Sequence, residues 1–151
     1  MPKRFSWVLE NRIAGMERPG LFDGLENDYS FLTDKDINVI INLEEEIFYE
    51  NINDSFRIKH IPIDDFKAPR LEDFVEFVSF VKEEIDKGNS IVVHCHAGMG
   101  RTNLMLASYI INEFKVQYDK ALEIVRESRP IHFVTEEQVD ALRDYYFGVY
   151  L

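Results

Sequence analysis

The only cysteine of this chain and an arginine six positions later are the residues best suited to covalent chemistry. Cys95 follows the β-branched run Ile91–Val93, which predicts a buried strand. The segment that follows contains Gly98 and Gly100, which let the backbone curl so that its N–H groups point inward. A ring of such groups binds a tetrahedral anion. Arg101 adds a planar guanidinium that can hold two oxygens of a phosphate.

A single cysteine also has a simpler explanation, because a free cysteine is most often a small buried hydrophobic residue. Here Cys95 lies at the end of the expected strand, ahead of a helix that should begin near Arg101 and contain the apolar run 104–111. The unpaired N–H groups and the dipole of that helix favour negative charge. We therefore expect Cys95 to be a thiolate nucleophile and Arg101 to be its electrophilic clamp.

Residues 94–102 read His-Cys-x-x-Gly-x-x-Arg-Thr, which resembles the HCxxGxxR(S/T) signature of the cysteine-dependent protein tyrosine phosphatases. Phe5–Val8 and Arg12–Gly15 resemble the N-terminal segment of the small atypical dual-specificity phosphatases in that superfamily. The resemblance therefore extends over the whole chain. One departure is Asn103, where the family usually has glycine, and this change could alter how the start of the helix packs.

The resemblance implies a role for each residue of the motif. Cys95 would attack phosphorus and form a phosphocysteine intermediate, and the Thr102 hydroxyl would ease departure of the sulfur. His94 would hold the cysteine loop through hydrogen bonds, although it could also be a satisfied polar residue at a strand end. The substrate phosphate would be bound by the loop residues His96, Ala97, Gly98, Met99, Gly100 and Arg101.

The adjacent carboxylates Asp64 and Asp65 are candidates for the general acid. They lie in the proline-containing stretch 60–69, where neighbouring residues of an extended segment point in opposite directions, so only one can readily face the phosphate. In the family, a mobile general-acid loop lies at this place, and its Asp-Phe pair matches Asp65 and Phe66. We predict that Asp65 is the acid, that the Phe66 ring packs and fixes the loop, and that Asp64 is a solvated or capping carboxylate.

Arg129 and Gln138 are candidates for accessory roles. In the family an arginine of this kind braces the phosphate loop, but Arg129 could equally be a cation that favours the end of a helix dipole. Gln138 matches a glutamine near the family's site, yet Thr135 and Gln138 also form a capping box, which suffices locally and which we favour. The acidic run Glu44–Glu46 is interpreted as a solvated loop or the start of a short helix rather than a metal site, and no chemistry is assigned to it.

The histidines raise a metal-binding alternative. His94 and His96 would share one side of a continuing strand, and Cys95 and His60 could join them. Adjacent residues of an extended strand point to opposite faces, however, so Cys95 would not join both histidines without a bend. We predict no metal and no cofactor.

The expected elements define an α/β fold. Strands are expected at 5–9, 11–14, 37–43, 56–61 and 91–93, and helices at 23–36, 71–87, from about 101, 118–128 and 136–149. Strand–helix–strand connections imply a mostly parallel central sheet flanked by helices, with the phosphate-binding loop at the carboxyl end of a strand. The length predicts a single catalytic domain, residues 1–151.

The composition limits the expected partners and location. The formal net charge of −11 should repel nucleic-acid backbones and anionic lipids, so neither nucleic acid nor a membrane is expected as a partner. No apolar stretch is long enough to span a bilayer, and the N-terminus does not resemble a signal peptide. A single cysteine forms no internal disulfide and suits a reducing compartment, so we expect a cytoplasmic protein.

These observations predict a phosphatase for phosphorylated proteins or peptides, with phosphate, sulfate or vanadate as active-site anions. Nothing resembles the longer N-terminal segment with which the larger tyrosine-specific enzymes deepen their pocket. The expected substrates are therefore phosphotyrosine together with phosphoserine or phosphothreonine. The alternatives are a phosphatase of phosphoinositides, nucleotides or RNA 5′-phosphates, and a phosphoryl-binding module without turnover. Against the binding module stands the intact set Cys95, Arg101, Thr102 and Asp65.

Overall fold

The computed structural model describes residues 2–49 and 55–151. Its strands are β1 (Ser6–Leu9), β2 (Ile13–Met16), β3 (Val39–Asn42), β4 (Arg57–His60) and β5 (Ile91–His94). Its helices are α1 (Leu25–Asp34), α2 (Leu71–Asp86), α3 (Arg101–Phe114), α4 (Tyr118–Ser128) and α5 (Glu136–Tyr145), followed by the π-helix η1 (Tyr146–Tyr150).

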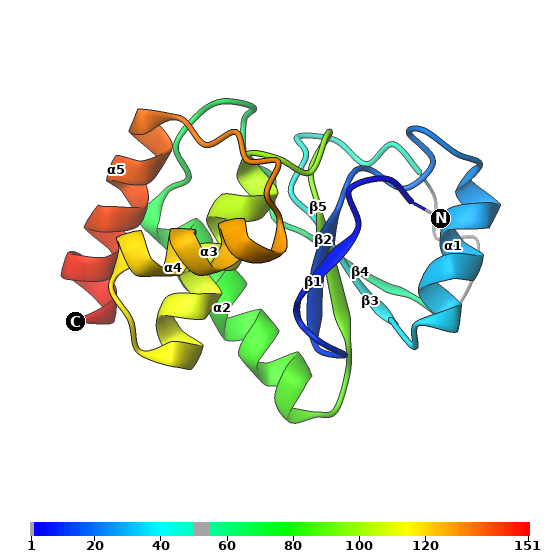
Figure 1. The fold of residues 1–151 in the computed structure, drawn as a ribbon, viewed down its shortest axis with the longest axis horizontal. Coiled ribbons are helices and arrows are strands. Elements are labelled where there is room, and N and C mark those ends of the chain that lie inside the picture. Colours follow the sequence, from blue (N-terminus) through cyan, green and yellow to red (C-terminus); the bar gives the residue numbers. More distant parts are fainter. Residues whose placement is uncertain (1, 50–54) are drawn as a thin grey trace.

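The strands form one sheet in the order β1-β2-β5-β3-β4. β1 pairs with β2 in the antiparallel sense, whereas all the other neighbours are parallel. Helices α2 to α5 cover one face of the sheet, and α1 covers the other (Figure 1). This arrangement confirms the predicted α/β fold with a mostly parallel central sheet, and it makes β5 the middle strand.

The core consists of two apolar layers, one on each face of the sheet. Successive strand residues alternate between them, so Val93 packs on the side of α2 to α5 whereas Val92 packs on the side of α1. Phe74 and Phe77 of α2 fill the larger layer and are fully buried. Burial of such side chains contributes about 1.5–3 kcal/mol each. The strand that precedes Cys95 is therefore held rigidly from both faces.

Several element boundaries differ from those expected. Asn11 adopts a left-handed φ of 62° and forms part of the turn after β1, so β2 begins at Ile13, and it extends to Met16, two residues beyond the expected end at 14. Helix α2 begins at Leu71 as expected and ends at Asp86, one residue before the expected end. The last α-helix ends at Tyr145 and continues as a π-helix.

Across residues 2–49 and 55–151, none of the helices combines the length and the apolar character needed to span a bilayer.

Candidate active site

The loop between β5 and α3 carries the cysteine of the motif. Cys95 is buried directly after the last residue of β5, and α3 begins at Arg101. Gly98 has a φ of +75°, and a Cβ atom at this position would lie 2.5 Å from the Met16 carbonyl oxygen. Only glycine fits both the backbone conformation and this close approach. The loop therefore packs closely against the end of β2.

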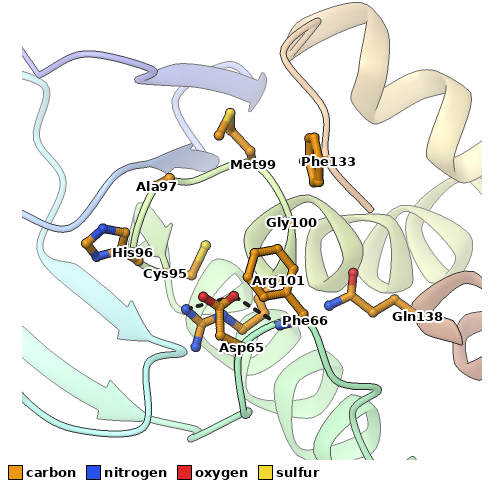
Figure 2. A pocket seen from close by; sticks show the side chains of 10 residues that line it. All are labelled: Asp65, Phe66, Cys95, His96, Ala97, Met99, Gly100, Arg101, Phe133 and Gln138. Atoms are coloured by element: carbon orange, nitrogen blue, oxygen red, sulfur yellow. Dashed lines mark hydrogen bonds and ion pairs between the residues drawn. The ribbon is translucent and has the colours of Figure 1, made fainter. Parts of the chain in front are cut away.

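A pocket of about 260 Å³ opens over this loop. Figure 2 shows the side chains that surround it: Asp65, Phe66, Cys95, His96, Ala97, Met99, Gly100, Arg101, Phe133 and Gln138. They come from the loop after β4, the loop after β5, the start of α3, the segment before α5, and α5 itself. All but Phe66 and Phe133 were candidate site residues. Phe133 was missed, since an isolated aromatic residue in a loop carries no periodic signal.

Thr102 contacts the sulfur of Cys95 directly. Its buried hydroxyl lies 3.0 Å from the Cys95 Sγ atom and donates a hydrogen bond to it. A donor at this distance stabilises negative charge on sulfur, both before attack and when sulfur acts as a leaving group. The structure therefore brings together the pair that the motif predicts.

Arg101 is nearly completely buried, and its guanidinium faces the pocket (Figure 2). Nη1 donates to the Ile63 carbonyl at 2.8 Å and to Glu45 Oε1 at 2.5 Å. Nη2 lies 3.5 Å from Asp65 Oδ1. Burial raises the pKa of Glu45, but hydrogen bonds from its own backbone and from Arg101 outweigh this effect and lower the pKa. An ionised carboxylate therefore orients the guanidinium.

The interpretation of Glu44–Glu46 as a solvated loop without a role is right only in part: Glu45 and Glu46 are exposed in a loop, but Glu44 is buried, and the first two residues bind arginines. Glu45 contacts Arg101, and Glu44 is buried and accepts two hydrogen bonds of 2.9 Å from Arg18. The sequence placed the run directly after a predicted parallel strand, at the sheet edge where sites form, but only the structure shows that this strand, β3, lies beside β5.

His94 connects the end of β5 to the cysteine loop. Its Nδ1 lies 3.1 Å from the Cys95 carbonyl oxygen, and its Nε2 lies 2.5 Å from the Tyr49 hydroxyl. Complete burial lowers the pKa of His94 to about 4, so the ring is neutral near pH 7. Since a carbonyl only accepts, Nδ1 carries the proton and Nε2 accepts from Tyr49. The expected contact with the loop is present, while the contribution of Tyr49 was not foreseen.

The structure separates the two adjacent carboxylates. Both are exposed, but Asp65 lines the pocket and Asp64 lies outside it. Phe66 has a left-handed φ of 60°, and its ring is 60% exposed at the pocket rim. The expected packing of this ring against the protein is therefore wrong, because the ring lines the open pocket and stays largely exposed. The loop is instead contacted by α5, through a hydrogen bond of 3.2 Å from Gln138 Nε2 to the Lys67 carbonyl.

Gln138 combines both of its candidate roles. The capping box is present, since the Thr135 N–H donates to Gln138 Oε1 at 3.0 Å and the Gln138 N–H donates to Thr135 Oγ1 at 3.2 Å. The same side chain is buried and lines the pocket. Capping and a position at the site are thus compatible, because the start of α5 faces the pocket.

Arg129 contacts the phosphate-binding loop as a bracing residue would. It is buried and donates to the carbonyls of Gly98 and Arg4 and to the Ser6 hydroxyl. Burial lowers the pKa of Arg129 to about 10, which leaves the guanidinium charged near pH 7. These contacts favour the bracing interpretation over that of an ordinary cation at a helix end.

The histidines of the metal-binding alternative are occupied elsewhere. His60 Nε2 lies 2.7 Å from the Glu44 carbonyl oxygen, and His96 Nδ1 lies 3.2 Å from an Arg18 guanidinium nitrogen. Among residues 2–49 and 55–151, no three histidine, cysteine, aspartate or glutamate side chains gather in a way that could hold a metal ion.

A thiol at the end of a central parallel strand, facing a helix N-terminus, is the type of site found in cysteine-dependent phosphatases. A family model described as "Polymorphic toxin system, DSP-PTPase phosphatase" matches residues 14–115. The chain belongs to this family, and with it to the small dual-specificity type of the cysteine-dependent protein tyrosine phosphatases.

Curated relatives share part of the chain. The tyrosine-protein phosphatase CDC14 of Candida albicans is 26% identical over 124 residues, which are 81% of this chain and 23% of that protein. A probable dual specificity protein phosphatase of Dictyostelium discoideum is 34% identical over 101 residues, 62% of this chain and 44% of that protein. The chain thus spans less than half the length of these two relatives.

Solved structures share the fold over nearly the whole chain. Tk-PTP in its active form superposes with a TM-score of 0.85 at 23% identity, covering 99% of this chain and 100% of that one. PTPMT1 in complex with PI(5)P superposes with a TM-score of 0.84 at 19% identity, covering 96% of each chain. These structures confirm the predicted fold.

Proposed function

We propose that this protein is a phosphatase that hydrolyses phosphotyrosine, and also phosphoserine or phosphothreonine, through a phosphocysteine intermediate. Residues 1–151 would form its catalytic domain. The observation that carries the proposal is the convergence of Cys95, Arg101 and Asp65 on one pocket, with the Thr102 hydroxyl on the sulfur. A reducing compartment such as the cytoplasm would keep the thiol available.

The mechanism has two displacement steps. In the first, the Cys95 thiolate attacks phosphorus, the bond to the ester oxygen breaks, and Asp65 gives its proton to that oxygen. The loop N–H groups and Arg101 stabilise the equatorial oxygens of the transition state. In the second, Asp65 takes a proton from water as the water attacks phosphorus, and the sulfur leaves with the Thr102 hydroxyl donating to it.

The contact between Arg101 and Asp65 fits this sequence of events. Before substrate binds, the guanidinium lies 3.5 Å from the carboxylate. An entering phosphate dianion competes for the guanidinium and places like charge beside Asp65. The contact with Arg101 is then lost, and the carboxyl can turn toward the leaving oxygen, which a general acid must reach. Substrate binding would therefore prepare Asp65 for its first step.

The pocket lining supports a protein substrate over a phosphoinositide. Phe66, Met99 and Phe133 give the pocket an apolar lining, and Arg101 is the one lysine or arginine side chain among the lining residues that the structure describes. A ring with further phosphates would need more cations than this. A phosphoinositide is nevertheless included in the test, because the fold neighbour PTPMT1 was solved in complex with PI(5)P.

The proposal is tested first with p-nitrophenyl phosphate in the presence of EDTA, and then with a panel at fixed salt. The panel contains phosphotyrosine and phosphothreonine peptides, a phosphoinositide and an RNA 5′-triphosphate. We expect hydrolysis of the aryl ester and of the peptides, with no effect of the chelator. Selective hydrolysis of the phosphoinositide or the RNA would assign the alternative substrate class. Phosphate binding without hydrolysis of any ester would identify a binding module.

Asp65→Asn is expected to lower kcat by about 10²-fold and to remove the alkaline limb of the pH–rate profile for aryl esters. An amide cannot protonate the leaving oxygen, and that limb reports loss of the acid's proton. Steady-state rates between pH 5 and 9 provide the measurement.

Asp64→Asn is the matched control, because it changes the same group one residue away, outside the pocket. It should leave kcat and the pH profile nearly intact. If the two variants exchange these phenotypes, Asp64 is the acid. If neither changes the rate, the general acid lies outside this loop.

A further inference from the structure

Asn103, the departure from the family pattern, is completely buried as the third residue of α3. Its amide nitrogen donates to the Met99 carbonyl at 3.0 Å and lies 3.4 Å from the Ile131 carbonyl oxygen. Its amide oxygen accepts from Arg129 Nε at 2.6 Å. These partners fix the orientation of the amide, because carbonyls only accept and a guanidinium only donates.

Arg129, which donates to Asn103, also contacts the loop at the carbonyl of Gly98, one residue before Met99. Its Nη2 donates to the Gly98 carbonyl, so Asn103 and Arg129 together hold two consecutive carbonyls of the loop. In a planar trans peptide the N–H points opposite to the C=O. Fixing the carbonyls of Gly98 and Met99 therefore fixes the N–H directions of Met99 and Gly100, both of which line the pocket.

We propose that Asn103 is a positioning residue that acts with Arg129 to hold the phosphate-binding loop with its N–H groups directed at the anion. The inference rests on the proposed function, which it deepens by adding a residue that the motif does not contain. This role differs from simple packing of the helix, because the Asn103 amide is hydrogen-bonded to loop carbonyls and to Arg129.

Of the Asn103 contacts, the hydrogen bond from Arg129 should matter more than the one to the Met99 carbonyl. The Met99 carbonyl has a second donor, the Phe133 N–H at 2.8 Å, and would stay paired without Asn103. Glycine at position 103 would instead deprive a buried guanidinium N–H of its side-chain acceptor, which is costly in a desolvated site. Burial already lowers the pKa of Arg129, so its guanidinium lies in a desolvated place where a lost acceptor is not replaced by water.

The test compares Asn103→Gly with Asn112→Ala. Asn112 is a matched control, because it lies on the same helix and its amide likewise donates to the carbonyl four residues earlier, that of Ser108, at 2.9 Å. It also donates to the Tyr145 hydroxyl, away from the pocket. Three quantities are measured: the vanadate dissociation constant, the pH dependence of Cys95 alkylation by iodoacetamide, and the melting temperature.

Asn103→Gly should weaken vanadate binding by about 10-fold or more, because small displacements of oriented groups have large effects. It should also move Cys95 alkylation to higher pH. Asn112→Ala should lower the melting temperature and leave the other two quantities unchanged. In a double-mutant cycle, Asn103→Gly should add little to Arg129→Met, because the two residues act as a unit.

A lower melting temperature of Asn103→Gly with unchanged vanadate binding and alkylation would overturn the inference and leave Asn103 as a packing residue. Additive effects in the cycle would overturn the coupling to Arg129. If the double variant does not fold, the comparison with Asn112→Ala still decides. None of these quantities requires turnover, so a wild-type protein that binds vanadate but hydrolyses no ester refutes the proposed function alone.

Discussion

Replacing Cys95 with serine is expected to abolish hydrolysis of aryl phosphates, with a loss of about 10⁴-fold or more, as for other essential nucleophiles. A serine hydroxyl stays protonated near pH 7 and is a far weaker nucleophile than a thiolate. The anion site should survive, because the loop N–H groups and Arg101 do not depend on the sulfur. The rate is measured with p-nitrophenyl phosphate, and binding is measured as phosphate-induced stabilisation against heat.

The hydrolysis rate and phosphate binding together distinguish loss of the nucleophile from loss of the loop structure. A variant that neither turns over nor binds phosphate would indicate a collapsed loop, and Cys95→Ala would then be needed to separate the nucleophile from the fold. A variant that hydrolyses the ester at the wild-type rate would contradict the covalent mechanism. The close Thr102 hydroxyl should remain satisfied, because a serine oxygen can also accept from it.

Arg101→Lys is expected to lower kcat/KM by about 10²–10³-fold, the range seen when a preorganised transition-state donor is removed. The buried guanidinium donates to the Ile63 carbonyl and to Glu45, and it forms an ion pair with Asp65. A lysine ammonium has no planar fork, so it cannot keep these contacts and also hold two phosphate oxygens. Both kcat and KM are measured with an aryl phosphate.

Arg70→Lys is a suitable control for Arg101→Lys. Arg70 also donates to a carboxylate, that of Asp73 at 3.1 Å, but it lies at the surface outside the pocket. The control should keep full activity. If Arg101→Lys is as active as this control, the anion clamp has been assigned to the wrong residue.

The local part of the site could be predicted because it lies in nine consecutive residues. The spacing within 94–102 places Cys95, Arg101 and Thr102 in and just after one short loop, so no contact between distant segments is needed to bring them near each other. Asp65 could be located through its Asp-Phe pair and its place between a strand and a helix. In both cases the pattern of one segment, together with the family resemblance, was enough to place Cys95, Arg101 and Asp65 at the pocket.

The rest of the site depends on contacts between segments distant in sequence. Glu45 reaches Arg101 only because β3 lies beside β5, a strand order that no local pattern encodes. Arg129 lies 31 residues from the carbonyl that it holds, so its two interpretations could not be separated from the sequence. The end of β2 was misplaced for a related reason: the strand extends to Met16, opposite His94, because it pairs in parallel with β5.

The Cys95 sulfur at the base of the pocket is also the only thiol of this chain. A thiolate that attacks phosphorus also reacts with peroxide and becomes a sulfenic acid. Many redox-sensitive proteins protect that product by condensing it with a nearby second cysteine, but residues 1–151 contain none. Recovery from oxidation therefore requires either attack by a backbone nitrogen to form a sulfenamide, or a thiol supplied by another molecule.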